Sequence, residues 1–223
     1  MLKLYPITLA GNTKGGFPLW IERLGKIDLD GLRRLRDSTR KLIRHNIFMY
    51  EYVYNLLLDP TDPVRKIFLI LDLEGAYLSN LVGDAWDYLK TILLIGSQHY
   101  PDFTIKTFIV NAPRSLYFTY RLLGPFISTQ TKAKVKIVRD KLTMQRLLLE
   151  HFAPENLPVC YGGADRTPLN EHNNHIELLK FVDELNGCRK NGVVSPEVVT
   201  PVAAKRLSEC VGSSNSSCGL VVR

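Results

Sequence analysis

Two pairs of polar side chains have a spacing that could serve acid–base or metal chemistry. Asp72 and Glu74 follow an apolar run and stand two residues apart, which places both on one face of an extended segment. Such a pair could bind a cation or exchange protons, but we favour a turn in which Asp72 accepts bonds from backbone N–H groups at Gly75. His172 and His175 are three residues apart, yet no cysteine or aspartate stands beside them at metal-ligand spacing. We therefore predict no metal site.

The motifs of common catalytic centres do not occur in this sequence. There is no Gly-x-Ser-x-Gly nucleophile turn. There is also no phosphate loop of the Gly-Lys-Ser/Thr type and no Gly-x-Gly-x-x-Gly. We therefore expect no catalytic residues and no enzymatic activity.

Two basic segments could contact anions. Residues 128–136 carry hydroxyl groups and lysines at a turn into a strand, where backbone N–H groups are also free, and a phosphate group needs these donors. A solvated turn explains this segment about as well. The basic residues at 33–44 are best interpreted as a solvated helix face, with adhesion to an anionic membrane as the alternative. We predict no nucleic-acid binding, because the aromatic side chains that follow match the buried side of that helix.

The pattern of apolar residues predicts the elements that position these side chains. Strands are expected at 18–22, 66–73, 104–110 and 134–138, and helices at 28–58, 83–100, 115–126, 142–152 and 170–185. Strands that alternate with helices of this length predict an α/β fold with a mainly parallel sheet and helical crossovers. A short helix at 202–210 and disorder at 213–217 are expected toward the end of the chain.

Composition narrows the class of protein further. Of the 223 residues 45% are hydrophobic and 23% are charged, as in ordinary folded domains, and the net charge of +7 favours anionic partners. No apolar run approaches the roughly 18 residues that a membrane-spanning helix needs, and the first residues do not resemble a signal peptide. The four cysteines show no Cys-x-x-Cys spacing and are expected to be free thiols. These features predict a cytoplasmic protein.

Several short motifs occur in a fixed order along the chain. They are Gly16-Phe17-Pro18, Asp72-Leu73-Glu74-Gly75, Tyr100-Pro101, Asn111-Ala112-Pro113, Gly124-Pro125-Phe126, Thr131 with Lys134, and Leu157-Pro158 to Gly162-Gly163. This ordered set resembles the CRAL-TRIO family of lipid-binding domains, and most closely its phosphatidylinositol transfer branch. The resemblance implies a lipid-binding domain over 1–163, whose sheet floors an apolar cavity closed by a gate helix. We expect the helical bundle that usually precedes this domain to be absent, and residues 164–223 to form a tail with one helix.

The resemblance also implies which residues contact the ligand. In the phosphatidylinositol branch a carboxylate after Tyr-Pro, a threonine and a lysine serve the inositol phosphate, and their matches here are Asp102, Thr131 and Lys134. The gate matches 115–127, and its expected cavity residues are Tyr117, Phe118, Leu122, Leu123 and Phe126.

Two departures from that branch affect the expected ligand. Phe17 replaces an arginine that serves the phosphate group, and Ile67 and Leu69 replace the hydroxyl residues that serve a choline lipid. We therefore predict non-enzymatic binding and transfer of phosphatidylinositol or a related hydrophobic molecule, with no cofactor besides the bound lipid. Transient contact with an anionic membrane is expected. The alternative is a lipid-sensing or scaffold module that regulates a signalling or trafficking partner without net transfer.

Overall fold

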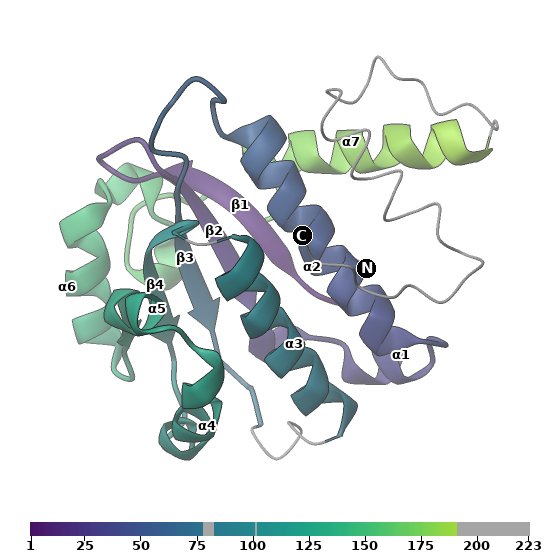
Figure 1. Cartoon of the computed structure of the whole chain (residues 1–223). Coiled ribbons are helices and arrows are strands. Elements are labelled where there is room, and N and C mark those ends of the chain that lie inside the picture. Colours follow the sequence, from purple (N-terminus) through teal and green to yellow (C-terminus); the bar gives the residue numbers. More distant parts are fainter. Residues whose placement is uncertain (78–82, 101, 191–223) are drawn as a thin grey trace.

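A five-stranded sheet forms the centre of the computed structural model, which describes residues 1–77, 83–100 and 102–190 (Figure 1). The strands lie side by side in chain order: β1 (Ile7–Asn12), β2 (Pro18–Arg23), β3 (Ile67–Asp72), β4 (Thr104–Val110) and β5 (Val135–Ile137). β1 runs antiparallel to β2, and the other neighbours are parallel. The predicted α/β fold with a mainly parallel sheet is confirmed. The expected helix at 202–210 and the disorder at 213–217 lie outside the described residues.

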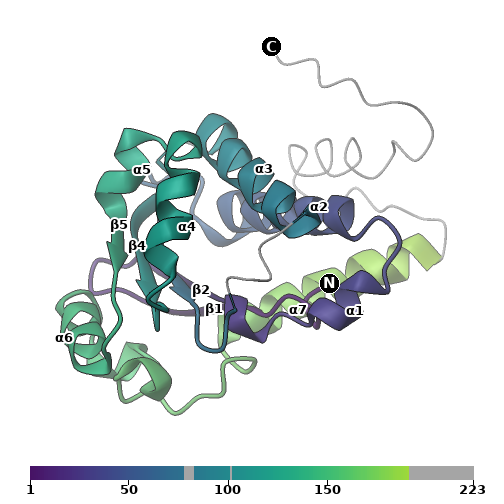
Figure 2. The same cartoon turned by 90° about the horizontal axis from the view of Figure 1, so that it is seen from below.

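Helical crossovers cover both faces of this sheet (Figure 2). One face carries α2 (Ser38–Tyr52), α3 (Asp84–His99), α4 (Leu116–Leu123) and α5 (Thr129–Lys134), the opposite face carries α6 (Lys141–His151), and α7 (Asn173–Lys190) contacts the edge strand β1. None of the helices in the described part of the chain combines the length and apolar character needed to cross a bilayer.

The edge strand β1 was not among the predicted strands. Its sequence contains Gly11, which weakens a strand, and alternation of apolar and polar residues is absent from it. The strand forms because a turn folds it back onto β2, where the Phe17 N–H donates to Thr13 Oγ1 at 3.0 Å and the Thr13 N–H donates to the Phe17 carbonyl at 2.8 Å. Pairing with a neighbouring strand thus overrides the weak local preference.

The single helix predicted over 28–58 is wrong. The structure has α1 (Leu29–Arg33), then α2, then a π-helical turn at Val53–Leu57. Asp37 separates the first two because its φ of 56° is left-handed and cannot continue a right-handed helix. The sequence offers Asp28 or Asp30 as the residue that caps the first helix. The structure has Asp28, whose side chain accepts from the Gly31 N–H at 2.8 Å.

The segment predicted as one helix over 115–126 is shorter in the structure. α4 ends at Leu123 and a 3-10 turn follows at Gly124–Phe126. Pro125 explains the change, because it has no N–H to donate to the preceding turn. The next residues form α5, which was expected to be a turn, and the Ser128 hydroxyl caps it by accepting from the Thr131 N–H.

The two faces of β2 have different environments. Leu19 and Ile21 are fully buried against α6 in one core cluster, whereas Trp20 belongs to the cluster beneath α2. Since side chains alternate along a strand, Glu22 points to the same face as Trp20. An acidic side chain therefore lies on the apolar face that carries α2, α3 and α4.

Asp72 connects three segments beyond the sheet's carboxyl edge. Its carboxylate accepts from the Glu74 N–H at 2.9 Å, from the Asn111 side-chain amide at 2.8 Å and from the Tyr161 hydroxyl at 3.0 Å. Gly75 completes the turn with a φ of 82°. The interpretation of Asp72 as a turn-capping residue is confirmed. The alternative of a cation or acid–base site is disfavoured, because the oxygens of the Asp72 carboxylate already accept these three hydrogen bonds.

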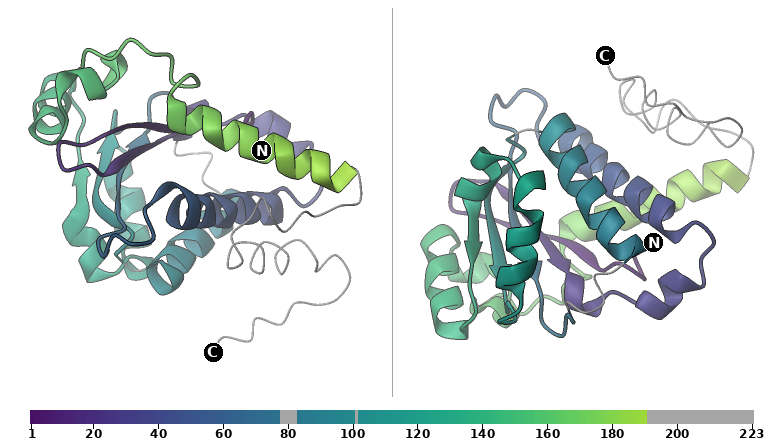
Figure 3. Two further views of the ribbon diagram at one scale, coloured as in Figure 1. Left: turned by 90° about the horizontal axis from the view of Figure 1, so that it is seen from above. Right: turned by 60° about the horizontal axis from the view of Figure 1, so that its bottom comes forward.

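The predicted helix at 170–185 is present as α7, which begins three residues later and extends to Lys190. It lies beside β1 in both views of Figure 3, with Leu178 fully buried and the Asn174 side-chain amide donating to the Ala10 carbonyl at 3.1 Å. His172 and His175 are buried near its start, and within the described residues no group of three metal-ligating side chains includes them.

Candidate functional site

A large cavity lies between the sheet and the helices α2, α3 and α4, with a volume of about 1340 Å³. Its floor is apolar because alternate strand residues face it: Ile67, Leu69, Leu71, Leu73 and Ile109. Leu42 of α2 and Leu89 and Leu93 of α3 line the opposite wall. Such a space suits hydrocarbon, since placing acyl chains in it removes them from water.

The two positions expected to have lost their hydroxyl groups, Ile67 and Leu69, lie on this cavity floor. Their hydrocarbon side chains offer no hydrogen bond to a phosphate group. Phe17 lies at the turn between β1 and β2 and does not line the cavity among the described residues.

The helix α4 forms one wall of the cavity, but only one of its faces does so. Leu116 and Leu123 are buried and line the cavity, as do Phe126 and Ile127 just beyond the helix. The expectation that Leu123 and Phe126 line the cavity therefore agrees with the structure.

Three other residues expected to line the cavity do not. Tyr117, Phe118 and Leu122 are 61%, 70% and 64% exposed and are not among the residues around the cavity. The physical reason is helical periodicity: positions 116, 119, 120 and 123 occupy the inner side, so 117, 118 and 122 occupy the outer side. The sequence of this helix is apolar on both sides and could not reveal which side faces inward.

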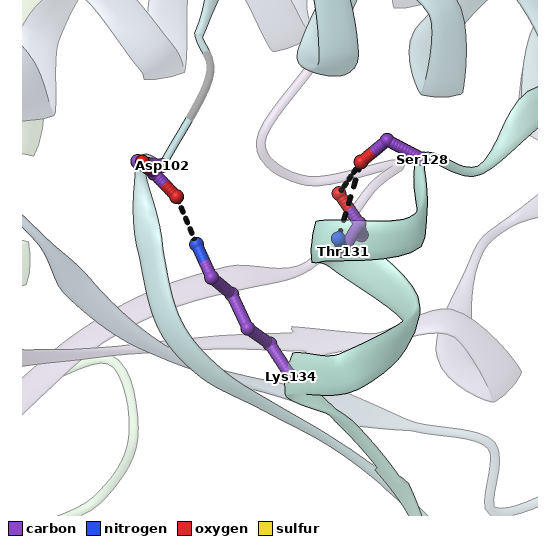
Figure 4. Close-up of polar contacts among 4 residues, drawn as sticks. All are labelled: Asp102, Ser128, Thr131 and Lys134. Atoms are coloured by element: carbon purple, nitrogen blue, oxygen red, sulfur yellow. Dashed lines mark hydrogen bonds and ion pairs between the residues drawn. The ribbon is translucent and has the colours of Figure 1, made fainter.

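The residues expected to bind the headgroup line the same cavity, and Figure 4 shows them as two pairs, Asp102 with Lys134 and Thr131 with Ser128. Lys134 Nζ donates to Asp102 Oδ1 at 2.5 Å, and Ser128 Oγ and Thr131 Oγ1 are 2.9 Å apart. The hydrogen bond from Lys134, followed by its charge, holds the pKa of Asp102 below its usual range. The structure therefore pairs Lys134 with Asp102 and Thr131 with Ser128, and all four residues line the cavity.

Lys134 and the hydroxyl groups of Ser128 and Thr131 could each exchange their present hydrogen-bond partner for an oxygen of a phosphate group. Lys134 supplies a positive charge, and the two hydroxyl groups are donors and acceptors that can rotate. In the described structure the charge of Lys134 is balanced by Asp102, whose side chain is half-exposed. A phosphate group would therefore compete with the Asp102 carboxylate for Lys134, whereas sugar hydroxyls could donate to that carboxylate.

A second polar group, around Glu22, was not predicted. The Tyr5 hydroxyl donates to Glu22 Oε2 at 2.8 Å, and the Asn46 side-chain amide donates to the Tyr88 hydroxyl at 2.5 Å. These four residues all line the cavity. Burial raises the pKa of Glu22 to about 7. Burial, and then the nearby Glu22 carboxylate, also raise the pKa values of the Tyr50 and Tyr88 hydroxyls.

One signal in the sequence could have located Glu22. It follows the apolar residues Leu19, Trp20 and Ile21 directly and falls on the same face as Trp20. An acidic residue at an inward position of a strand usually has a partner. That partner, Tyr5, is 17 residues away and could not be identified from local spacing.

Comparison with known proteins defines the class to which this fold and cavity belong. The chain matches the CRAL/TRIO domain over residues 2–163, which is more than half of its length. It is therefore a member of the CRAL/TRIO domain family, as predicted from its ordered motifs.

Its relatives place it in one branch of this family. The chain is 27% identical over 206 residues to the SEC14 cytosolic factor of Eremothecium gossypii, with 90% of this chain and 64% of that protein covered. It is 29% identical over 169 residues to the phosphatidylinositol/phosphatidylcholine transfer protein SFH4 of Arabidopsis thaliana, with 74% and 27% covered. The predicted branch is confirmed. The chain spans less than two-thirds of the length of either relative.

A solved structure agrees with the fold. The crystal structure of Sfh5 is similar with a TM-score of 0.59 and 20% sequence identity, over 76% of this chain and 58% of that one. At this identity the likeness concerns the path of the chain and leaves the ligand open.

Proposed function

We propose that this protein binds a phospholipid in its cavity and carries it between membranes without chemical change. Phosphatidylinositol is the favoured ligand, with its acyl chains over the sheet and its headgroup at Asp102, Thr131 and Lys134. The observation that carries this proposal is the position of these three residues on the lining of a large apolar cavity. The similarity to a phosphatidylinositol/phosphatidylcholine transfer protein of Arabidopsis thaliana supports the same ligand.

The free energy gained by burying the acyl chains of a lipid in the cavity is of the size that a lipid carrier needs. Each methylene transferred from water into an apolar space contributes about 0.8 kcal/mol, so a chain of roughly ten methylenes contributes about 8 kcal/mol. This gain is of the same size as the loss on leaving a bilayer. Lipid exchange is therefore nearly balanced when the protein lies on a membrane and strongly opposed in water.

The helix α4 would act as the movable wall. Its inner residues close the cavity, while Tyr117, Phe118 and Leu122 present an apolar surface to solvent. Contact of this outer surface with a bilayer would remove it from water and allow α4 to move. The protein would thus be cytoplasmic and bind membranes transiently, with the lipid as its only required ligand.

Native mass spectrometry of the purified protein tests this proposal directly. We expect a bound phospholipid, and we expect transfer of labelled phosphatidylinositol from donor to acceptor vesicles. The matched control is Lys134→Ala, which should lower phosphatidylinositol transfer more than binding of an uncharged lipid. A protein that carries no lipid and moves none between vesicles would refute the proposal.

A second function rests on the resemblance alone, which implies a phosphate-serving arginine where this sequence has Phe17. With that charge missing, the protein would sense a lipid and regulate a signalling or trafficking partner without net transfer. Binding of phosphatidylinositol without acceleration of its transfer between vesicles would support this second function.

A further inference from the structure

The cavity has two polar regions, and they lie at different levels of the sheet. Glu22 of β2 pairs in register with Leu71 of β3, whereas Thr104, next to the Asp102 region, pairs with Ile67. These two levels are four residues apart in β3, or about 13 Å at roughly 3.3 Å per residue. Glu22 and Asp102 therefore belong to separate polar regions of the cavity.

The Glu22 carboxyl group lacks an internal cation. The residue is only 8% exposed, and no ion pair of Glu22 occurs among the residues that the structure describes. A buried carboxylate without a positive partner is costly, so its presence on the wall of an apolar cavity calls for a partner. The Tyr5 hydroxyl donates to Glu22 at 2.8 Å and the Trp20 side chain is a second neighbouring donor, while a carboxylate offers about four acceptor positions.

The surroundings of Glu22 define the chemistry of such a partner. An anionic group is excluded, because it would face the carboxylate in an apolar space. A group that donates a hydrogen bond fits, since Glu22 can accept it. The Tyr88 hydroxyl accepts from Asn46, also hydrogen-bonds the Tyr5 side chain, and lines the same cavity.

We propose that Glu22, together with Tyr5 and Tyr88, forms a second ligand subsite that takes the hydrogen-bond-donating end of an amphiphile, either a hydroxyl group or a protonated amine. The subsite rests on the lipid cavity of the proposed function, but it is independent of the headgroup residues Asp102, Thr131 and Lys134. With this subsite, the cavity would also accept lipids whose polar end is uncharged or cationic. Such a lipid would place its polar end at Glu22 and its hydrocarbon along the sheet.

Three amphiphiles of ten carbon atoms each test this subsite in the full-length protein: 1-decanol, decylammonium and decanoate. Each displaces a fluorescent apolar probe from the cavity at pH 7.5. We expect 1-decanol and decylammonium to bind at least about tenfold more tightly than decanoate, because only they donate to a carboxylate. Equal affinity of all three in the Asp102→Ala/Lys134→Ala variant, which lacks the headgroup cation that could hold decanoate, would overturn the proposal.

Two variants separate the two donor classes. Glu22→Gln keeps an acceptor oxygen but loses the charge, so it should retain 1-decanol binding and lose about tenfold in decylammonium affinity. Glu22→Leu should weaken both. Binding of 1-decanol and decylammonium that both variants leave unchanged would also overturn the proposal.

The headgroup site provides the control. The double variant Asp102→Ala/Lys134→Ala, which removes both charges of the headgroup site, should keep the preference for 1-decanol and decylammonium over decanoate while it lowers phosphatidylinositol binding. Failure of the phosphatidylinositol measurement alone would refute the proposed function and leave the Glu22 subsite in place, so the two failures are distinguishable.

A pH series gives an independent readout. Glu22 is mostly protonated at pH 6 and mostly ionised at pH 8, because its pKa is raised to about 7 by burial. Decylammonium affinity should therefore increase about tenfold between these pH values in the unmodified protein. The same increase in Glu22→Gln would show that another group is responsible and would overturn the assignment.

Discussion

Replacement of Glu22 by glutamine should make the stability of this protein less dependent on pH. Burial raises the pKa of Glu22 from its usual value of 4.5 to about 7. Between these two pH values the folded protein holds a proton that the unfolded chain has released. The free energy of unfolding therefore falls as the pH rises through this window, and the loss is complete above pH 7. Glutamine does not titrate, so the Glu22→Gln variant should lack this loss.

The size of the effect follows from the same two values. At roughly 1.4 kcal/mol for each pKa unit, the difference between 4.5 and about 7 corresponds to about 3 kcal/mol. The stability of Glu22→Gln relative to the unmodified protein should thus increase by about 3 kcal/mol between pH 4.5 and pH 8. Shifts of other groups, such as His45, occur in both proteins and cancel in this difference.

Urea unfolding followed by tryptophan fluorescence measures this difference. Trp20 neighbours Glu22 on β2 and lies in the buried core, so it reports on the relevant part of the fold. Both proteins are unfolded at several values between pH 4.5 and pH 8. A stability difference that stays constant across this range would refute the reasoning, because it would mean that Glu22 ionises as readily in the folded protein as in the unfolded chain.

Three further predictions concern the cavity and its support. Lys134→Ala should reduce phosphatidylinositol binding by about tenfold in a vesicle-extraction assay, because a charge-assisted bond to the phosphate group is lost; an unchanged affinity would remove Lys134 from the site. Replacement of Tyr117 and Phe118 by serine should change the free energy of unfolding by less than about 0.5 kcal/mol, since both are exposed, yet slow lipid transfer several-fold; unaltered transfer rates would argue against membrane contact by α4. Tyr161→Phe should lower the free energy of unfolding by about 2 kcal/mol, because the buried hydroxyl bond to Asp72 is removed; thermal and urea unfolding that match the unmodified protein would contradict this role.

Much of the sheet could be predicted from the sequence, because continuous apolar segments are typical of buried parallel strands. The β4 prediction has the bounds that the structure shows, and β3 differs by one residue at each end. The failures depend on information that no local pattern contains. Asp37 adopts a left-handed conformation inside an otherwise helical pattern, and β1 needs its pairing with β2.

Some residues of the candidate site could be predicted from the sequence and others could not. Resemblance to a family predicted Asp102, Thr131 and Lys134 as headgroup residues. The structure pairs Asp102 with Lys134 and places Thr131 on the lining of the same cavity. The resemblance could not orient α4, because a helix that is apolar on both sides has no preferred inner face by sequence. Glu22 was missed because its environment is created by Tyr5, 17 residues earlier, and by the cavity itself.

The position of α7 beside β1 has a consequence for how this domain avoids self-association. An edge strand offers unpaired backbone groups on which a second molecule can add a strand. Here Leu178 of α7 is buried in the core, and the Asn174 side-chain amide donates a hydrogen bond to the Ala10 carbonyl of β1. The helix α7 therefore covers that edge. The family match ends at residue 163, before α7 begins. A fragment cut at that residue would expose the β1 edge and is expected to aggregate, so α7 serves as a built-in protection against polymerisation.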